Sequence, residues 1–274
     1  MSTFDNFLFT RPKAAIGPAR QAGAGLMILL SGFAIVGPVV IPSDPAAQDF
    51  GASLAPIGGD YLLGADHYGR SLVARLAHGA RLSFGMAFLT MLAAAIPGVL
   101  LGLLAAWKGG WTERLLELVA TVVLALPGLM LVLLLLAFAP GNYGPLFLGL
   151  ALTLWVEFYR VTKTTTRTVL AQPHIEAARM LGFGSRYIFV HYVLPVIGPM
   201  IATLSAFAMA TAIIAVSTLS AISVGLQPPT PELGSMIVEL LPYYAEAPMH
   251  VLLPATLIFL LVLGLQLLAQ GDRA

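Results

Sequence analysis

We expect an all-α, polytopic membrane protein with six transmembrane helices and with both termini in the cytoplasm. The composition gives the first indication, because 58% of the residues are hydrophobic, only 10% are charged and the mean hydropathy is +0.90. Soluble domains carry about 25% charged residues, so this chain lacks the charge to cover a globular surface. The apolar residues also gather in six runs of about 20 residues, the length that crosses a bilayer.

The sequence lacks the motifs of several kinds of chemistry. It has no cysteine, and its five histidines do not approach the spacing of a HExxH metal site. It also lacks a GxSxG motif, so we expect no catalytic residue and no bound metal. No P-loop GxxxxGK[ST] occurs, so the chain does not bind ATP by that device. The net charge of +1 and the absence of a basic cluster argue against a nucleic-acid partner.

The first part of the chain contains one apolar run between two polar segments. Residues 1–21 are predicted to be a cytoplasmic tail. The run at 22–42 is too long for the core of a signal peptide, so we expect an uncleaved first transmembrane helix. Residues 43–81 are too polar for lipid and too long for a turn, which predicts a lobe outside the membrane; the resemblance described below implies that it is periplasmic. Four apolar residues of the tail either lie in the membrane interface or belong to a disordered segment: Phe4, Phe7, Leu8 and Phe9.

The rest of the chain, 82–270, is predicted to form a core of five helices. Two of these helices contain a Pro-Gly pair, at 97–98 and 127–128, where we expect a kink. The fifth of the six spans is rich in Ala, Ser and Thr, which favours burial among other helices. A long inner loop at 163–196 and a periplasmic loop at 223–249 interrupt the core. The five spans are predicted at 82–106, 115–138, 146–162, 197–222 and 250–269.

The basic residues predict which side of the membrane each loop faces. Six spans place both termini on one side, and Lys and Arg favour the cytoplasmic side. Three of the 14 basic residues do not fit this orientation, because they lie just before the second span, on the predicted external side: Arg70, Arg75 and Arg81. The other eleven agree with cytoplasmic termini: Arg11, Lys13, Arg20, Lys108, Arg114, Arg160, Lys163, Arg167, Arg179, Arg186 and Arg273.

A patterned polar stretch, 172–195, lies between the fourth and fifth spans. Pro173 suits the first turn of a helix, and Glu176 lies where a carboxylate is favoured by the helix dipole. Small alanines follow, and Gly182 ends the helix. This pattern is compatible with a helix that seats in the groove of another protein. It is equally compatible with a helical linker that lies idle at the membrane interface.

This stretch resembles the EAA loop of ATP-binding-cassette (ABC) importer permeases. The resemblance rests on Glu176-Ala177-Ala178, then Gly182, then Leu194-Pro195; Tyr192 stands where the pattern expects isoleucine. It implies that Glu176 orients a coupling helix, that the two alanines fit the groove of an ATPase subunit, and that Gly182 turns the chain away. The implied ATPase-coupling residues are Glu176, Ala177, Ala178, Arg179, Gly182, Leu194 and Pro195.

Residues 64–83 narrow the family, because they are similar to the signature of the dipeptide, oligopeptide and nickel importer permeases. Ala65, Ser71 and Ala74 depart from it, and a further segment, 219–237, resembles the same family with Leu233 in place of a tryptophan. The family-motif residues of the external lobe are Gly64, Asp66, Gly69, Arg70, Arg75 and Arg81.

The three external arginines have two readings. In the first, they belong to a folded lobe in which Arg70 or Arg75 pairs with Asp60 or Asp66. In the second, they anchor the start of the second span at lipid phosphates.

Carboxylates inside a span would indicate an ion relay. Glu117 and Glu157 are the only two near spans, and both lie close to predicted inner ends. Arg160 follows Glu157 by three residues, so we expect an ion pair between them rather than a relay.

The resemblance implies the type I ABC importer permease fold and a place in the bacterial inner membrane. The chain would form a translocation path with a second permease for peptides or a related small solute, such as nickel, a metal chelate or an opine. Two ATPase subunits would bind ATP and magnesium, an external binding protein would deliver the solute, and this chain would bind no cofactor. The alternatives are an ATP-independent channel or secondary transporter, and a membrane scaffold.

Overall fold

The computed structural model describes residues 17–41, 43–59, 61–138, 143–226 and 228–270. Within these residues the chain is helical, with short loops and no strand beyond two isolated bridges. Positions 1–16 of the predicted tail, which include Phe4, Phe7, Leu8 and Phe9, lie outside the described residues. The long helices are α2 (Pro18–Val40), α3 (Leu72–Lys108), α4 (Gly110–Leu124), α5 (Gly128–Phe138), α6 (Tyr143–Leu170), α9 (Leu194–Ala221) and α11 (Pro248–Ala269). The short ones are η1 (Phe50–Ala52), α7 (Pro173–Met180), α8 (Ser185–Ile188), the π-helix η2 (Phe189–Val193), α10 (Leu233–Leu240) and η3 (Leu241–Tyr243).

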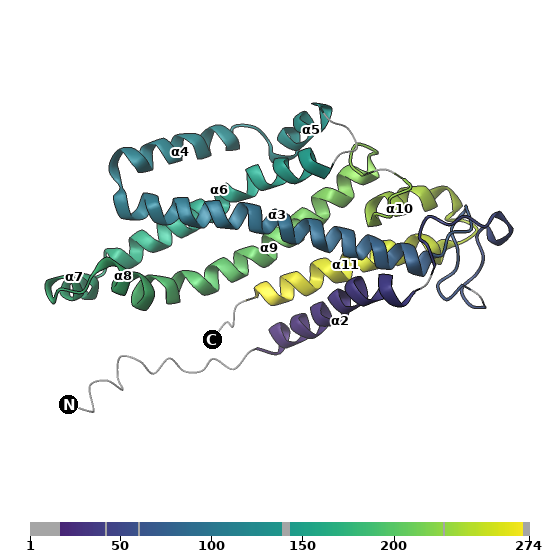
Figure 1. Cartoon of the computed structure of the whole chain (residues 1–274), viewed down its shortest axis with the longest axis horizontal. Coiled ribbons are helices and arrows are strands. Elements are labelled where there is room, and N and C mark those ends of the chain that lie inside the picture. Colours follow the sequence, from purple (N-terminus) through teal and green to yellow (C-terminus); the bar gives the residue numbers. More distant parts are fainter. Residues whose placement is uncertain (1–16, 42, 60, 139–142, 227, 271–274) are drawn as a thin grey trace.

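The helices form an elongated bundle with different structures at its two ends (Figure 1). Helices α7 and α8 lie at one end, whereas α10 and the loops around η1 lie at the other. The start of α2 and the end of α11 both point toward the end that carries α7. Helices α2 and α11 are in close contact at Gly23, where an added Cβ would lie only 2.7 Å from the Cβ of Leu267.

Four helices are long and apolar enough to cross a membrane, or five if α4 and α5 count as one broken span. They are α2, α3, the continuous helix from Ser185 to Ala221, and α11. The remaining predicted span corresponds to α6, which has 28 residues but also carries Glu157, Arg160 and a row of threonines. The prediction of several apolar spans is therefore confirmed, while their number, six, stays a prediction.

The two Pro-Gly pairs behave differently. Helix α3 continues without a break through Pro97 and Gly98, whereas α4 and α5 meet at 77° around Pro127. Residues 124–130 are all exposed, so no packing holds that segment in one straight helix. Around Gly98, by contrast, α3 is packed against α6. A proline disturbs a helix where neighbouring residues do not support the backbone.

Two glycines of α3 make its close packing on α6 possible. A Cβ on Gly98 would lie 2.6 Å from the carbonyl oxygen of Trp155, and a Cβ on Gly102 would lie 2.7 Å from that of Tyr159. The pair has the Gly-x-x-x-Gly spacing that lets two membrane helices approach each other closely. This contact between α3 and α6 fixes the position of α6, whose inner end leads to α7.

Replacing Gly102 with alanine is expected to destabilise the protein by about 1–3 kcal/mol, because the new methyl group overlaps the α6 backbone. Gly85→Ala on the same helix is the matched control, since no atom lies within 4 Å of its Cβ position. There alanine should stabilise the helix by about 0.5–1 kcal/mol. Thermal unfolding of the detergent-purified protein should therefore shift in opposite directions, and shifts of the same sign would contradict this account.

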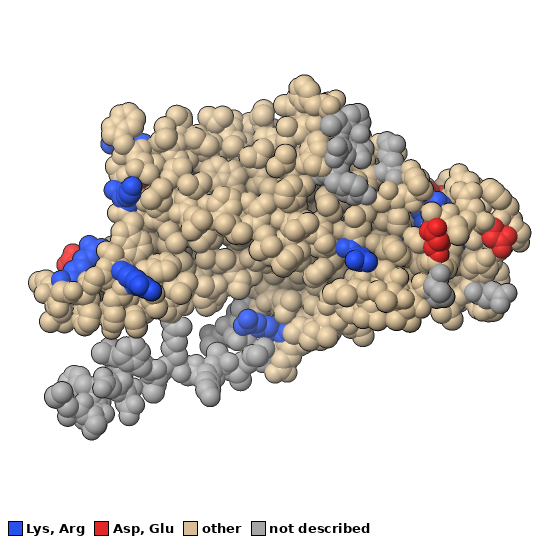
Figure 2. Space-filling model, in the orientation of Figure 1, with Lys and Arg blue, Asp and Glu red and all other residues tan. Residues whose placement is uncertain are grey.

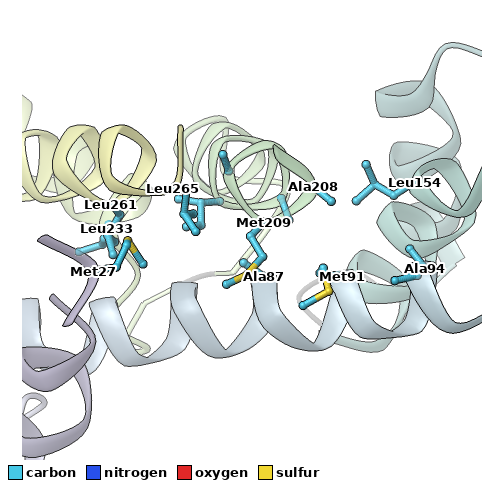
Figure 3. Packing of buried hydrophobic residues seen from close by; sticks show 14 of the residues in the cluster. Met27, Ala87, Met91, Ala94, Leu154, Ala208, Met209, Leu233, Leu261 and Leu265 are labelled. Carbon is cyan, nitrogen blue, oxygen red and sulfur yellow. The ribbon is translucent and has the colours of Figure 1, made fainter. Parts of the chain in front are cut away.

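The core lies between α2, α3, α6, α9, α10 and α11. In Figure 3 Met209 lies beside Ala87, whereas Met27 lies next to Leu233 and Leu261. The predicted burial of the fifth span is confirmed, because 50% of its most apolar window is buried against 22–39% in the other three long apolar helices. Small side chains let α9 pack on several neighbours at once.

Candidate functional site

Helix α7 forms where the sequence predicted a short helix. Pro173 occupies the first turn, Glu176 is the acidic residue of that turn, and the helix ends at Met180. Gly182 follows with a φ of +85°, and its N–H donates to the carbonyl of Arg179 at 3.0 Å. The N–H of Phe183 donates to the carbonyl of Ala178 at 3.1 Å. These two bonds form a Schellman motif, in which glycine is favoured at the left-handed position.

The two faces of α7 differ in exposure. Ile175 and Ala178 are buried, at 0% and 4% exposed, whereas Ala177 lies on the surface. Ala178 lies three residues from Ile175 on the face of α7 that packs on the rest of the chain, so the fit of both alanines in an ATPase groove stays a prediction. Met180 and Leu181 are 83% and 77% exposed. The surface at the end of α7 is thus more apolar than the sequence analysis assumed.

The charged residues around α7 have no ionic partner in the described part of the chain. Glu176, Arg179 and Arg186 are exposed, and none of them forms an ion pair with another described residue. Figure 2 shows that most Lys and Arg side chains on the visible face lie in the half that carries α7. This end of the molecule therefore offers charge and exposed apolar groups together.

Aromatic rings connect α7 to the start of α9. Tyr192, which departs from the family pattern, lies 5.4 Å from His174 of α7, measured between ring centroids. Tyr187 stacks between Phe183 and His191, with centroid distances of 4.4 and 4.0 Å. The structure thus gives Tyr192 a packing role that the pattern did not predict.

Leu194 and Pro195 begin α9 directly after the π-helix η2. The N–H of Leu194 donates to the carbonyl of Phe189, five residues earlier. Pro195 has no N–H to donate, and its ring disfavours a regular turn before it. The wider turn accommodates the proline within a helix that runs on from Ser185 to Ala221.

Ion pairs join α4 and α6 in the halves of these helices that lie nearer α7. Arg160 contacts Glu117 at 3.0 Å, Lys163 also pairs with Glu117, and Arg167 contacts Glu113 at 2.5 Å. The expected pair between Glu157 and Arg160 does not form, because the Arg160 side chain reaches across to α4 instead. A three-residue spacing permits a pair on a helix surface but does not exclude a better partner on a neighbouring helix.

At the opposite end, three buried charges, Asp66, Arg70 and Arg75, and the half-buried Glu239 join the lobe to α10. Arg70 contacts Asp66 at 2.6 Å and Glu239 at 2.7 Å. Arg75 contacts Asp66 at 2.5 Å and Glu239 at 3.0 and 3.2 Å. The predicted pairing of Arg70 and Arg75 with Asp66 is confirmed, while Asp60 lies outside the described residues. Sequence reasoning missed Glu239.

Hydrogen bonds and charges hold Asp66 in its ionised form. Burial alone would raise the pKa of Asp66, but the Arg70 N–H and the charges of Arg75 and Arg70 outweigh that effect. The pKa of the carboxyl therefore lies below its ordinary value of 3.8. The N–H of Tyr68 donates to the same carboxylate at 2.9 Å.

The motif glycines allow close backbone contacts in the lobe. Gly69 has a φ of +73°, and a Cβ there would lie 1.6 Å from the carbonyl oxygen of Asp49. Gly64 has a φ of +84°, and a Cβ there would lie 2.4 Å from His250 Nε2. Arg81 is exposed on α3 and, within the described residues, joins neither the buried network nor another carboxylate.

The lowered pKa of Asp66 predicts that the end of the bundle with α10 is sensitive to acid. Because the folded-state pKa is the lower one, the stabilising effect is complete above the unfolded value and is lost as pH falls through the folded value. The unfolding temperature should thus fall below about pH 4. In Asp66→Asn it should be lower at neutral pH and should change less in acid. An identical acid profile in both proteins would contradict the assignment.

Comparison with known proteins decides the family. Residues 98–270 match the family described as binding-protein-dependent transport system inner membrane component, and this match includes α7 and α10. The chain belongs to this family. It is therefore a multi-pass membrane permease, a transport component and not an enzyme, as the EAA-like pattern implied.

Individual relatives agree with the narrower resemblance. The di/tripeptide transport system permease protein DppC of Pseudomonas aeruginosa is 34% identical over 97% of this chain and 88% of its own length. The dipeptide permease DppC of Haemophilus influenzae is 28% identical over 93% of this chain and 89% of its own length. The glutathione permease GsiD of Pectobacterium atrosepticum is 30% identical over 77% of this chain and 70% of its own length. The permease thus belongs with the dipeptide and oligopeptide group of ABC importers.

Proposed function

We propose that this chain is one of two permease subunits of a bacterial inner-membrane ABC importer of short peptides. The names of the relatives support this substrate class, because they refer to dipeptides, di/tripeptides and glutathione, which is itself a tripeptide. A second, homologous permease would supply the other half of the path. Two ATPase subunits would bind ATP and magnesium, and a binding protein would deliver the peptide from outside.

The observation that carries this proposal is the exposed end of α7. Met180 and Leu181 are apolar and are 83% and 77% exposed, and helix α7, which they end, lies at one extremity of the bundle (Figure 1). Exposed apolar side chains beside unpaired charges are typical of a protein interface. We assign this surface to the ATPase subunit, with Glu176 and Arg179 as its polar contacts and Gly182 as the turn that returns the chain to the bundle.

The topology in the membrane follows from this assignment. The end with α7 faces the cytoplasm together with the start of α2 and the end of α11, so α2, α3, α4–α5, α6, α9 and α11 provide six crossings. Residues 1–21 are then a cytoplasmic tail, while the lobe at 43–81 and the loop at 223–249 face the periplasm. The distribution of basic residues supports this orientation.

The mechanism is alternating access driven by the ATPase subunits. When ATP draws these subunits together, α7 moves with them and the helices behind it reorient toward the periplasm. Helix α7 is linked by the His174–Tyr192 ring contact to η2, which leads directly into α9, and this provides a route for the movement. The docking free energy has to differ between the two states, because a ligand that binds both equally shifts no equilibrium.

Reconstitution of the chain with its partners in liposomes tests the proposal. The complete complex should import di- and tripeptides only when ATP and the binding protein are present. The chain without ATPase subunits should be inactive. ATP-independent flux through the chain alone would instead support the channel or secondary-transporter alternative, and no flux in any combination would support a scaffold.

A further inference from the structure

One carboxylate in the middle of the bundle has no partner within the described part of the chain. Glu157 lies near the centre of the 28-residue α6, and its side chain is exposed. Arg160, one turn away, binds Glu117 on α4 at 3.0 Å. No ion pair or hydrogen bond joins Glu157 to another described residue, unlike Glu113 and Glu117 on α4.

The neighbouring helix places Glu157 about half a bilayer thickness from the end of α3. Gly98 of α3 packs against Trp155 and Phe158, the residues on either side of Glu157. Helix α3 continues for ten more residues, to Lys108, before it ends. At 1.5 Å per residue this is about 15 Å, or half the ~30 Å thickness of the hydrocarbon core. A carboxylate that faced lipid at this depth would be strongly disfavoured.

The side of α6 that carries Glu157 is polar, and from Glu157 toward α7 its side chains are exposed, while Thr153 is half-buried beside Gly128 of α5. Positions 153, 157, 164 and 168 share one face of a helix, and the other three of them are threonines. Thr164 and Thr168 are exposed and lie between Glu157 and the inner end of α6. Helix α3 packs on the opposite face, through Phe158 and Tyr159.

Two helices border this polar face. On one side α4 is joined to α6 by the ion pairs of Arg160 and Arg167. On the other side α9 approaches, with Thr165 Oγ1 at 3.5 Å from Met200 Sδ. The face therefore lies between α4 and α9, and it becomes more polar toward the end of α6 that leads to α7.

We propose that Glu157 is a cation-binding step of the translocation path, where its carboxylate accepts the N-terminal ammonium of a passing peptide. This inference rests on the proposed import of peptides. An ammonium group that leaves water for a narrow path loses hydration, and a fixed carboxylate with nearby hydroxyl groups compensates that loss. Glu157 could instead form an ion pair with the second permease. The threonines that continue to the inner end of α6 favour a path for a solute, because a single ion pair would not require them.

Cysteine substitution tests whether Glu157 faces an aqueous path. The chain has no cysteine, so Glu157→Cys provides one thiol in a complex whose partners are cysteine-free. A water-soluble thiol reagent should modify this residue and Thr164→Cys, and saturating dipeptide should slow both reactions. Leu152→Cys, about 140° around the helix, is the matched control and should not react. An unreactive Glu157→Cys in an assembled, ATP-hydrolysing complex would overturn the inference.

Uptake kinetics test whether the charge itself acts on the peptide. Glu157→Gln should lower kcat/KM for dipeptide uptake about tenfold, the effect expected for loss of a charge-assisted hydrogen bond. Glu157→Asp keeps the charge and should retain most of the uptake. If Glu157→Gln takes up dipeptide like the wild type, the inference is wrong. It is also wrong if the second permease dissociates from the Glu157→Gln complex, because Glu157 would then bind that subunit. Failure of the proposed function is distinguishable, since the wild-type complex itself would not import peptide.

Discussion

Replacing Arg75 with methionine is expected to destabilise the outer end of the bundle by about 3–5 kcal/mol. Arg75 is fully buried and donates hydrogen bonds to both Asp66 and Glu239. The four charges of this network balance, with two arginines and two carboxylates. Without Arg75 one negative charge would stay buried without compensation, which costs far more than the net value of an ion pair.

Thermal unfolding of the purified protein provides the measurement, and Arg167→Met provides the control. The ion pair between Arg167 and Glu113 has the same 2.5 Å separation, but Arg167 is 49% exposed. Its loss should cost no more than about 1 kcal/mol, because solvent screens exposed pairs. Equal effects in the two variants would show that burial does not decide the strength of the network.

A double variant separates the charge effect from lost packing. Arg75→Met combined with Glu239→Leu leaves Arg70 and Asp66 as a neutral pair, 2.6 Å apart. We expect this protein to recover part of the stability lost in Arg75→Met, since apolar residues often replace a buried ion pair at little cost. A double variant less stable than the single one would instead assign the main role to hydrogen-bond geometry.

This network shows what sequence reasoning can and cannot provide. The spacing of Asp66, Arg70 and Arg75 predicted that they meet, because they lie within one motif before a single helix. Glu239 is 164 residues from Arg75 and carries no local signal of that contact. The three arginines before the second span predict that carboxylates pair with them. They do not identify which of the acidic residues in the same loops forms the pairs.

The helical core was predictable where pattern alone decides the structure, and less so where packing decides it. Runs of apolar residues located the long helices. The Pro-Gly pairs at 97–98 and 127–128 look alike in sequence, yet only the second breaks a helix. The difference is that α3 packs on α6 through Gly98 and Gly102, while residues 124–130 are exposed. Tertiary contacts of this kind cannot be read from a dipeptide.

The candidate coupling site was predictable as a helix but not as a surface. Pro173 and Gly182 marked its two ends correctly, because caps and left-handed glycines act locally. Which of its side chains face outward depends on how α7 packs on the rest of the chain, and in this structure Ala178 is buried while Leu181 is exposed. The role of the site in coupling stays a prediction.

Leu181→Asp is expected to uncouple the importer without unfolding it. Leu181 is 77% exposed in this chain, so a carboxylate there should change the stability of the isolated subunit by no more than about 0.5 kcal/mol. In an interface with the ATPase, the same change loses a buried side chain worth about 1.5–3 kcal/mol. Peptide-stimulated ATP hydrolysis and uptake by the complex should therefore fall about tenfold or more.

Gly182→Ala is the matched control in the same turn. Its Cβ would meet no atom within 4 Å, but the φ of +85° makes alanine strained by about 1 kcal/mol. It leaves the exposed Leu181 side chain in place, so uptake should fall by less than in Leu181→Asp. If Leu181→Asp assembles and transports like the wild type, the exposed end of α7 is not the ATPase contact. If both variants lose activity equally, the shape of the turn, rather than its apolar surface, transmits the movement.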